Sequence, residues 1–497
     1  MVKQISRRVL LGSLGAFVAH GTAWANAPVR SLRPQARGQA ALALAQVGPE
    51  DLIAKAGLKG EVAFAVADVK SGSALENVGG ATGLPPASVA KALTALYALD
   101  VLGGGYQFET RVLATGPIKN GVLKGDLILA GGGDPTLDTT TLAEMARQLK
   151  VAGVREVRGA FKVYDGMLPQ VHTIDRDQPD HVGYSPGVSG IALNFNRVHF
   201  EWKRTSKGYG VTMDARTAKY RPEVAMAQMR VVNRQLPVYT YEETPRIDKW
   251  TVARGALGKG GARWLPVRKP ALYAGDVFQT MARANGIVLK KVKVVQSLPT
   301  SSVLVTHRSA PLERILKAML KYSNNLTAEM VGMTATAARG KRPSSLKDSA
   351  SAMSRWAAGK YGMKDTRMVD HSGLGSASRM TPQDLVGALV QVRKAGGLRH
   401  MLKPFKMRDS NGRVMSKHPV KVDAKTGTLN FVSGLGGFMT ATDGTELAFA
   451  IFTADTATRS RIKRADREVP PGARTWNRRS KQLQQKLIER WAVLYGS

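Results

Sequence analysis

Ser88-Val89-Ala90-Lys91 opens an apolar segment, Ala92–Leu102, which ends at Gly103-Gly104-Gly105. Leucines recur in this segment at the spacing of one helix face, and the glycines provide a stop signal. Two prolines, Pro85 and Pro86, stiffen the chain just before the serine. The pattern predicts a helix over 90–102. It also places the serine and the lysine side by side in the first turn, because they are three residues apart.

This pairing of a serine with a lysine fits nucleophilic catalysis. A serine hydroxyl is a weak nucleophile until a base removes its proton. An amine acts as that base only when it is neutral, and burial or a nearby positive charge lowers its pKa toward that state. The amino end of the helix supplies one positive field, and a second lysine would supply another. Taken alone, the string is also explained by a helix cap followed by a surface lysine.

A second polar string, Lys321-Tyr322-Ser323-Asn324-Asn325, lies between two predicted helices, 312–320 and 326–336. A polar loop between helices can aim a hydroxyl and an amide into a cleft, although serine and asparagine also favour ordinary turns. Two registers stay open at this point. Tyr322-Ser323-Asn324 matches a Tyr-x-Asn pattern, and Ser323-Asn324-Asn325 matches Ser-x-Asn.

A third string, Lys425-Thr426-Gly427-Thr428, precedes a predicted hairpin whose strands, 437–442 and 445–453, are joined at Asp443-Gly444. The string is therefore expected on or beside a strand at a sheet edge, where an extended peptide can pair with it. Gly427 would let a substrate backbone come close, and Lys425 with Thr428 would hold a carboxylate. A cationic edge that discourages aggregation is the alternative explanation.

The three strings are more informative together than apart. Their order, Ser-x-x-Lys, Ser-x-Asn and Lys-Thr-Gly, is that of penicillin-binding proteins and serine β-lactamases. Ser323 follows Ser88 by 235 residues, which is more than a β-lactamase places between these motifs. The chain therefore resembles the class C penicillin-binding proteins of the D-alanyl-D-alanine carboxypeptidase/endopeptidase type, peptidase family S13. Further family-like strings are Gly131–Leu137, Ala192–Asn196 and Asp370–Leu374.

The resemblance implies a role for each catalytic residue. Ser88 would be the acylated nucleophile and Lys91 its base. Ser323 would relay a proton to the leaving group, and Asn325 would hold the substrate amide and help orient Lys91. Lys425 would add positive potential to the same site.

The resemblance also implies a substrate-binding set. Thr426, Gly427 and Thr428 would line the strand that receives the peptide, and the backbone N–H groups of Ser88 and Thr428 would form the oxyanion hole. Asp165 would correspond to an insert aspartate that contacts substrate.

One departure from the family pattern concerns a cation. Relatives often continue Ser-Gly-Leu-Ser-Arg, whereas this chain reads Ser372-Gly373-Leu374-Gly375-Ser376, with Arg379 as the next cation. An arginine that could grip a second substrate carboxylate is therefore missing or displaced.

The expected fold is a discontinuous α/β sandwich of the penicillin-binding transpeptidase/β-lactamase type. A strand over 61–68 and an amphipathic helix from about Thr475 would frame it. Residues 49–110 and 305–497 would form this catalytic domain. Residues 111–304 would form a mixed α+β insert between the first and second motifs, with a strand over 121–129 and a helix near 274–285.

The amino end reads as an export signal over 1–25, followed by a linker over 26–48. Arg7 and Arg8 precede a short apolar core, and Ala23-Trp24-Ala25 is a small-x-small cleavage site. The twin-arginine route and the Sec route both fit, and both predict a periplasmic enzyme. No other run is long and apolar enough to span a bilayer.

The charge is extreme, with 73 Lys+Arg against 37 Asp+Glu and a formal net charge of +36. Such a field favours polyanions. The basic residues are scattered and aromatic residues are only 6%, which argues against nucleic acid. Anionic cell-envelope polymers are the expected partners, and a merely solubilising surface is the alternative. The densest basic cluster, expected to meet the wall, comprises Arg459, Arg461, Lys463 and Arg464.

Two other sequence patterns do not indicate a functional site. Gly183-Tyr184-Ser185-Pro186-Gly187 formally matches a nucleophile elbow, but Pro186 lacks the N–H that the elbow needs as an oxyanion donor. The eight histidines show no metal-binding spacing. We therefore expect neither a metal nor a cofactor.

The leading hypothesis is a serine DD-peptidase that acts on peptidoglycan stem peptides through an acyl-enzyme on Ser88. β-Lactam antibiotics would then trap the same serine. A serine β-lactamase is the first alternative, although the sequence offers no convincing deacylation base. A wall-binding scaffold without catalytic activity is the second alternative, and the intact motifs argue against it.

Overall fold

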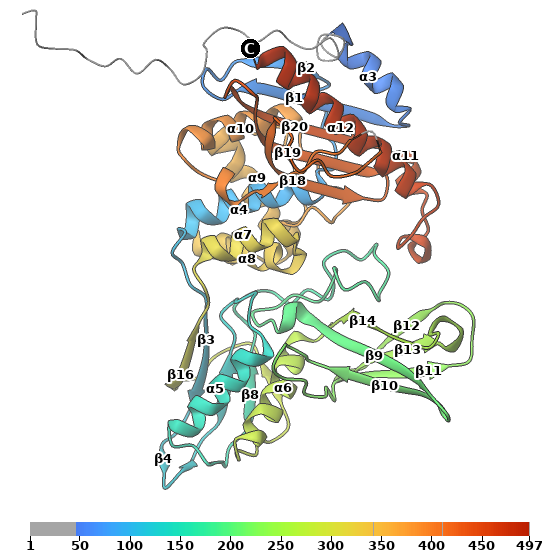
Figure 1. The fold of residues 1–497 in the computed structure, drawn as a ribbon. Helices are drawn as coiled ribbons and strands as arrows, with labels where there is room; N and C mark the ends of the chain where they lie inside the picture. The colour runs from blue at the N-terminus through green and yellow to red at the C-terminus, as the bar shows by residue number, and fades with distance from the viewer. Residues whose placement is uncertain (1–45, 341, 410, 497) are drawn as a thin grey trace, which may run out of the picture.

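The structure is a computed structural model that describes residues 46–340, 342–409 and 411–496. The predicted export signal over 1–25, and the predicted linker over 26–48 except its last three residues, lie outside these ranges. The described chain forms a catalytic lobe (46–108 and 309–496) and an insert (109–308), which are the upper and lower halves of Figure 1.

One six-stranded antiparallel sheet organises the catalytic lobe, in the order β17-β18-β19-β20-β1-β2. The first and last parts of the chain meet in it, because β1 pairs along its whole length with β20. The strands are β1 Glu61–Asp68, β2 Ala74–Val78, β17 Lys403–Pro404, β18 Lys421–Leu429, β19 Val432–Thr440 and β20 Glu446–Ala454. The fold is thus the predicted discontinuous α/β sandwich.

Helices cover both faces of this sheet (Figure 1). One core lies beneath α3 and α12, and a larger core packs α4 and α10 against the other face. Central strands such as β20 are buried along almost their whole length, which explains why their sequences are continuous apolar runs. The helices of the lobe are α3 Pro49–Ala56, α4 Ala90–Leu102, α7 Leu312–Tyr322, α8 Asn325–Ala338, α9 Leu346–Tyr361, α10 Pro382–Lys394, α11 Thr456–Ser460 and α12 Ala473–Tyr495.

The insert has its own core and its own sheets. Its main sheet has the order β15-β8-β6-β3-β16, with β3 Glu109–Ala114, β6 Leu127–Ala130, β8 Phe161–Tyr164, β15 Lys293–Val295 and β16 Ser302–Arg308. The predicted boundaries at 110/111 and 304/305 therefore fall inside β3 and β16, which pair with each other. Both strands belong wholly to the insert.

Three smaller sheets and two helices complete the insert. The sheets have the orders β10-β9-β14, β11-β13-β12 and β4-β5-β7. Their strands are β4 Ile118–Lys119, β5 Val122–Leu123, β7 Glu156–Val157, β9 Arg197–Thr205, β10 Gly208–Asp214, β11 Ala227–Val232, β12 Tyr239–Glu243, β13 Asp248–Ala253 and β14 Gly260–Pro266, and the helices are α5 Thr139–Val151 and α6 Pro270–Ala284. The single strand predicted over 121–129 is wrong, because β5 and β6 divide that segment between two sheets.

Candidate active site

The three motif strings converge at the junction of sheet and helices in the catalytic lobe. Ser88 lies in a short 3₁₀ turn, η1 Ala87–Val89, that leads directly into α4. The Lys91 Nζ lies 2.8 Å from the Ser88 Oγ and 2.8 Å from the Asn325 Oδ1. It also donates to the Ser372 carbonyl at 2.7 Å. One amine thus joins the first string, the second string and a loop after α9.

The second string uses the Ser-x-Asn register. Ser323 ends α7 in the left-handed conformation, with φ of 58°, and its Oγ accepts a hydrogen bond from the Lys425 Nζ at 3.0 Å. Asn324 instead caps α8 by accepting a hydrogen bond from the Thr327 N–H. The Tyr322 side chain points away from this network and is 71% exposed. The alternative Tyr322-Ser323-Asn324 register therefore has two of its three side chains outside the network.

The third string lies on β18, whose outer edge is largely open. The short strand β17 pairs only with Asp423 and Ala424, so the stretch from Lys425 onward has no strand neighbour on that side in the described residues. Gly427 packs against the serine turn: a Cβ there would lie 2.7 Å from the Pro86 carbonyl oxygen and 3.0 Å from the Ser88 nitrogen. The absence of a side chain at Gly427 thus lets the turn that carries Ser88 approach the strand.

Two cavities lie beside the motif strings. The first has a volume of about 260 Å³ and is lined by Ser88, Ser323, Asn325 and Thr428, together with Gln178, Tyr184, Gly373, Leu374, Leu429, Asn430, Arg459, Arg467, Glu468 and Asn477. The second, of about 1330 Å³, runs along β18 past Lys425, Thr426, Gly427 and Thr428. We name the first the serine cavity. Ser88 lines the first cavity, and both cavities share Ser323 and Thr428.

The electrostatics of the site favour the neutral form of Lys91. Burial and the positive charge of Lys425 lower the pKa of Lys91 to about 7, against the opposing pull of Glu329 and Asp370. A lysine with that pKa is neutral in a large fraction of molecules near neutral pH. Burial and the neighbouring Lys403 lower the pKa of Lys425 to about 8. Lys425 therefore stays mostly protonated at a pH where Lys91 is not.

A buried carboxylate, which no sequence motif marks, supports this arrangement. Glu329, on α8, accepts hydrogen bonds from the His371 and Ser372 N–H groups, both at 2.9 Å. It thereby fixes the loop whose Ser372 carbonyl holds Lys91. Burial and the neighbouring Asp370 raise the pKa of Glu329 above its usual value. Its one sequence signal is a lone acidic residue in an otherwise apolar helix.

Asp370 and His371 complete the support of that loop. Asp370 accepts the N–H groups of Gly373 and Gly375. His371 is fully buried, its Nε2 lies 2.7 Å from the Ser349 Oγ, and burial lowers its pKa to about 3. The histidine thus packs in neutral form.

Asp165 and Arg459 lie elsewhere than expected, and Arg379 bonds to its own loop. Asp165 is 1% exposed, accepts hydrogen bonds from Gln170 and Gln296, and does not line the serine cavity, so its placement does not support contact with substrate. Arg379 donates to the carbonyls of Ser376 and Ser378. Arg459, predicted in an exposed basic cluster, is 6% exposed and lines the serine cavity, because α11 turns it inward.

The insert reaches the site through the rejected elbow string. Ser185 is fully buried and bonded to Thr173, which fits its rejection as a nucleophile. The neighbouring Tyr184 carbonyl accepts a hydrogen bond from the Asn325 Nδ2 at 2.9 Å. Since that bond requires the amide nitrogen to face the insert, it leaves the Asn325 oxygen facing Lys91.

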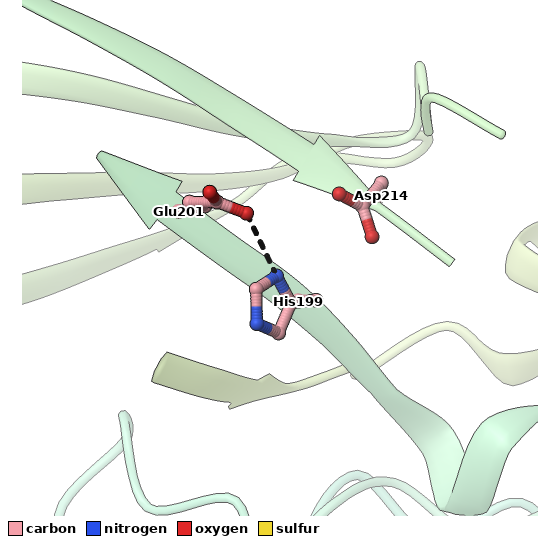
Figure 2. Close-up of side chains that lie close together, drawn as sticks. All are labelled: His199, Glu201 and Asp214. Atoms are coloured by element: carbon pink, nitrogen blue, oxygen red, sulfur yellow. Dashed lines mark ion pairs between the residues drawn. The ribbon is translucent and has the colours of Figure 1, made fainter. Parts of the chain in front are cut away.

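One group of potential metal ligands lies in the insert, on β9 and β10. Figure 2 shows His199 and Glu201 next to each other on one strand, with Asp214 on its neighbour. Arg216 already bonds the Glu201 and Asp214 carboxylates, each at 2.5 Å. A cation would have to displace this guanidinium, so the group is better explained as a salt bridge between strands.

Among the described helices, none is long and apolar enough to cross a bilayer.

A family model and curated relatives match most of the chain that forms this site. A family model described as the D-Ala-D-Ala carboxypeptidase 3 (S13) family matches residues 49–469. The chain is 26% identical over 445 residues to D-alanyl-D-alanine carboxypeptidase DacB of Haemophilus influenzae, covering 85% of this chain and 91% of that protein. It is 28% identical over 416 residues to a D-alanyl-D-alanine carboxypeptidase of Actinomadura sp. This alignment covers 78% of this chain and 76% of that protein.

The fold is also shared with a solved structure. The crystal structure of penicillin binding protein 4 from H. influenzae aligns with a TM-score of 0.69 at 23% identity, over 82% of this chain and 93% of that chain. Fold and motifs together define a penicillin-binding serine peptidase. Because the family model covers most of its length, the chain belongs to the S13 family of D-Ala-D-Ala carboxypeptidases.

Proposed function

We propose that the chain is a serine DD-peptidase that cleaves the bond between two D-alanines at the end of peptidoglycan stem peptides. The observation that carries this proposal is the position of the Lys91 Nζ between the Ser88 Oγ and the Asn325 Oδ1. The family and the names of the relatives support the reaction class.

In the acylation step, the neutral Lys91 amine takes the proton from the Ser88 hydroxyl. The Ser88 Oγ then bonds to the carbonyl carbon of the scissile peptide, and the carbonyl oxygen becomes an anion. The N–H groups of Ser88 and Thr428 are the candidate donors to this oxyanion, and losing one such donor typically costs about 10²–10³ in rate. Pre-formed donors cost no reorganisation during the reaction.

Collapse of the intermediate breaks the carbon–nitrogen bond. The leaving D-alanine nitrogen gains a proton from the Ser323 Oγ, which is in hydrogen-bond contact with Lys425. Ser323 regains a proton from the Lys91 ammonium formed in the first step, so Lys91 is neutral again. Lys425 and Thr428 would hold the carboxylate of that leaving residue. Water then gives a proton to Lys91 and attacks the Ser88 ester, the bond to the Ser88 Oγ breaks, the shortened peptide leaves as its carboxylic acid, and the proton on Lys91 returns to the Ser88 Oγ.

β-Lactams would acylate the same serine, because their strained amide carbonyl meets the same nucleophile. A structure of the H. influenzae penicillin binding protein 4 has been solved in complex with a β-lactam. A periplasmic location fits this substrate, and the export signal expected over 1–25 would direct the protein to that compartment.

Release of D-alanine from a soluble pentapeptide ending in D-Ala-D-Ala tests the proposed function. Purified protein should release D-alanine, and Ser88→Ala should reduce the rate by at least about 10³-fold, because the covalent route is lost. Release that persists in Ser88→Ala would reject Ser88 as the nucleophile. Rapid turnover of a reporter cephalosporin without a lasting adduct would favour a β-lactamase instead.

A further inference from the structure

A third cavity lies where the insert meets the catalytic lobe, beside the loop that carries the second motif string. Its volume is about 500 Å³, and it shares Tyr184, Ser323 and Asn325 with the serine cavity. We name it the interface pocket. Its other lining residues are mostly apolar and comprise Thr136, Gly183, Pro186, Phe195, Arg197, Ile315, Ala318, Met319, Tyr322, Asn324, Leu326 and Thr327.

A strained turn of the insert presents an aromatic ring to this pocket. Asn194, Phe195 and Asn196 have φ angles of 49°, 57° and 50°, a left-handed conformation that costs energy at each residue that is not glycine. The Asn194 Oδ1 accepts a hydrogen bond from the Thr139 N–H at 3.2 Å. The Asn196 Nδ2 donates to the Gly187 carbonyl at 2.8 Å. The two asparagines thus hold the turn, while the half-buried Phe195 lines the pocket.

Arg197, the first residue of β9, is the one charged side chain among the described residues that line the interface pocket. The centre of its guanidinium lies 5.5 Å from the centre of the Phe195 ring and 5.6 Å from that of the Trp264 ring. Within the described chain, this side chain has neither an ion pair nor a hydrogen bond, and its Nε is buried. Burial lowers the pKa of Arg197. A partly desolvated guanidinium without a counter-ion favours an anion that enters the pocket.

The charge and the lining together define the class of ligand. One guanidinium is neutralised by one negative charge, and its planar fork matches the two oxygens of a carboxylate. The side chains of Ile315, Met319 and Leu326 supply an apolar wall, which favours an apolar group on the same ligand. A cavity of this size, with apolar walls and one well-placed polar group, is typical of a small-molecule site.

We propose that the interface pocket binds a small amphiphilic monocarboxylate, with its carboxylate on Arg197 and its apolar group against the apolar wall. The site goes beyond the proposed function, because its described lining includes neither Ser88 nor any residue of β18. It therefore does not require a peptide to bind along that strand. A ligand bound here contacts the loop that carries Ser323 and Asn325.

Two probes of closely similar shape test the preference for a carboxylate, namely phenylbutyrate and its amide, phenylbutyramide. Isothermal titration calorimetry of the wild-type protein should show one saturable site that binds the carboxylate at least about tenfold more tightly than the amide, as a charge-assisted hydrogen bond provides. The same titration is then repeated on protein acylated by penicillin. Binding should persist, because the adduct occupies the serine cavity and leaves the interface pocket open.

Substitutions locate the site. Arg197→Gln should bring the ratio of the two affinities close to one, and retained amide binding in this variant shows that the pocket is intact. Arg314→Gln removes an exposed cation of α7 outside the pocket and should leave the ratio unchanged. Ala318→Trp fills the pocket from an exposed position of α7 and should abolish binding of both probes. Active-site titration with penicillin counts the folded fraction of each variant.

The contrary outcomes are distinct. A wild-type affinity ratio near one, a ratio that survives Arg197→Gln, or binding that persists in Ala318→Trp overturns the proposal. Loss of carboxylate binding on acylation also overturns it, because the probe would then lie in the serine cavity. Failure of penicillin to form any adduct counts against the proposed function alone, since the untreated protein and its variants still test the pocket.

Discussion

At the scale of single residues, the proposed mechanism depends on two lysines that hold different protonation states at one pH. In that mechanism Lys91 is neutral to accept a proton, and Lys425 is charged to attract a carboxylate. Their pKa values, about 7 and about 8, separate in the required direction. Burial lowers both values, and Lys425 lowers that of Lys91 further because like charges repel.

The rate of acylation by penicillin should therefore be bell-shaped in pH. Below about pH 7 the rate should fall as Lys91 gains a proton, and above about pH 8 it should fall as Lys425 loses one. The second-order rate constant for adduct formation, measured from about pH 5 to about pH 10, gives this profile. A rate that stays flat between about pH 5 and about pH 7 would contradict a lysine base of that pKa.

The Lys425→Gln variant assigns the acidic limb. Removing the positive charge raises the pKa of Lys91, so the acidic limb should move to higher pH while the overall rate falls. The same measurement on Lys403→Gln serves as control, because Lys403 lowers the pKa of Lys425, whereas the charge that lowers the pKa of Lys91 is that of Lys425. An acidic limb that stays in place in Lys425→Gln would show that the two lysines are not coupled.

At the scale of elements, α8 positions the loop that carries the Ser372 carbonyl. A Cβ on Gly332, in the middle of α8, would lie 2.2 Å from the His371 ring. Gly332→Ala should therefore displace the ring and the loop next to it. We expect a loss of about 1–3 kcal/mol in unfolding free energy and a slower acylation.

Gly359 in α9 is the matched control for that substitution. It is exposed, and a Cβ at this position would meet no other atom within 4 Å. Gly359→Ala should stabilise the protein by about 0.5–1 kcal/mol, because alanine favours the helix. Denaturant unfolding of both variants provides the comparison, and equal stability of the two would show that the α8–loop contact is unimportant.

The local sequence pattern was sufficient to predict many helices and strands, but not the pKa values of the site residues. The helix over 90–102 and the strand over 61–68 occur at the predicted bounds, since apolar periodicity and flanking glycines define them. The lowered pKa of Lys91 depends on tertiary burial and on a lysine 334 positions away, which no local pattern encodes. The same reason explains Arg459, whose inward direction is set by the packing of α11.

At the scale of the whole molecule, the insert and the end of the catalytic lobe are tied together beside the site. Arg464 bonds Asp180 at 2.6 Å, and Glu468 bonds Arg263 and His181. Since the Tyr184 carbonyl also holds Asn325, the insert helps set the geometry of the second motif. An isolated catalytic lobe would lack that contact.

The net charge of +36 leads to a prediction for the whole molecule. Binding to purified sacculi should weaken steeply as salt rises from about 0.05 to about 0.5 M, since the screening length shrinks to a few ångströms. Hydrolysis of a small soluble peptide should respond far less. Cosedimentation at several salt concentrations measures the first effect, and binding that is independent of salt would contradict an electrostatic attraction to the wall.

The assignment of Ser88 as the nucleophile of a penicillin-reactive site underlies every other step of the mechanism. Intact-mass measurement after incubation with penicillin, followed by peptide mapping, tests this assignment without further assumptions. We expect one adduct per chain, located on the peptide that contains Ser88 and absent from Ser88→Ala. An adduct on any other residue, or none on the folded protein, would contradict the assignment.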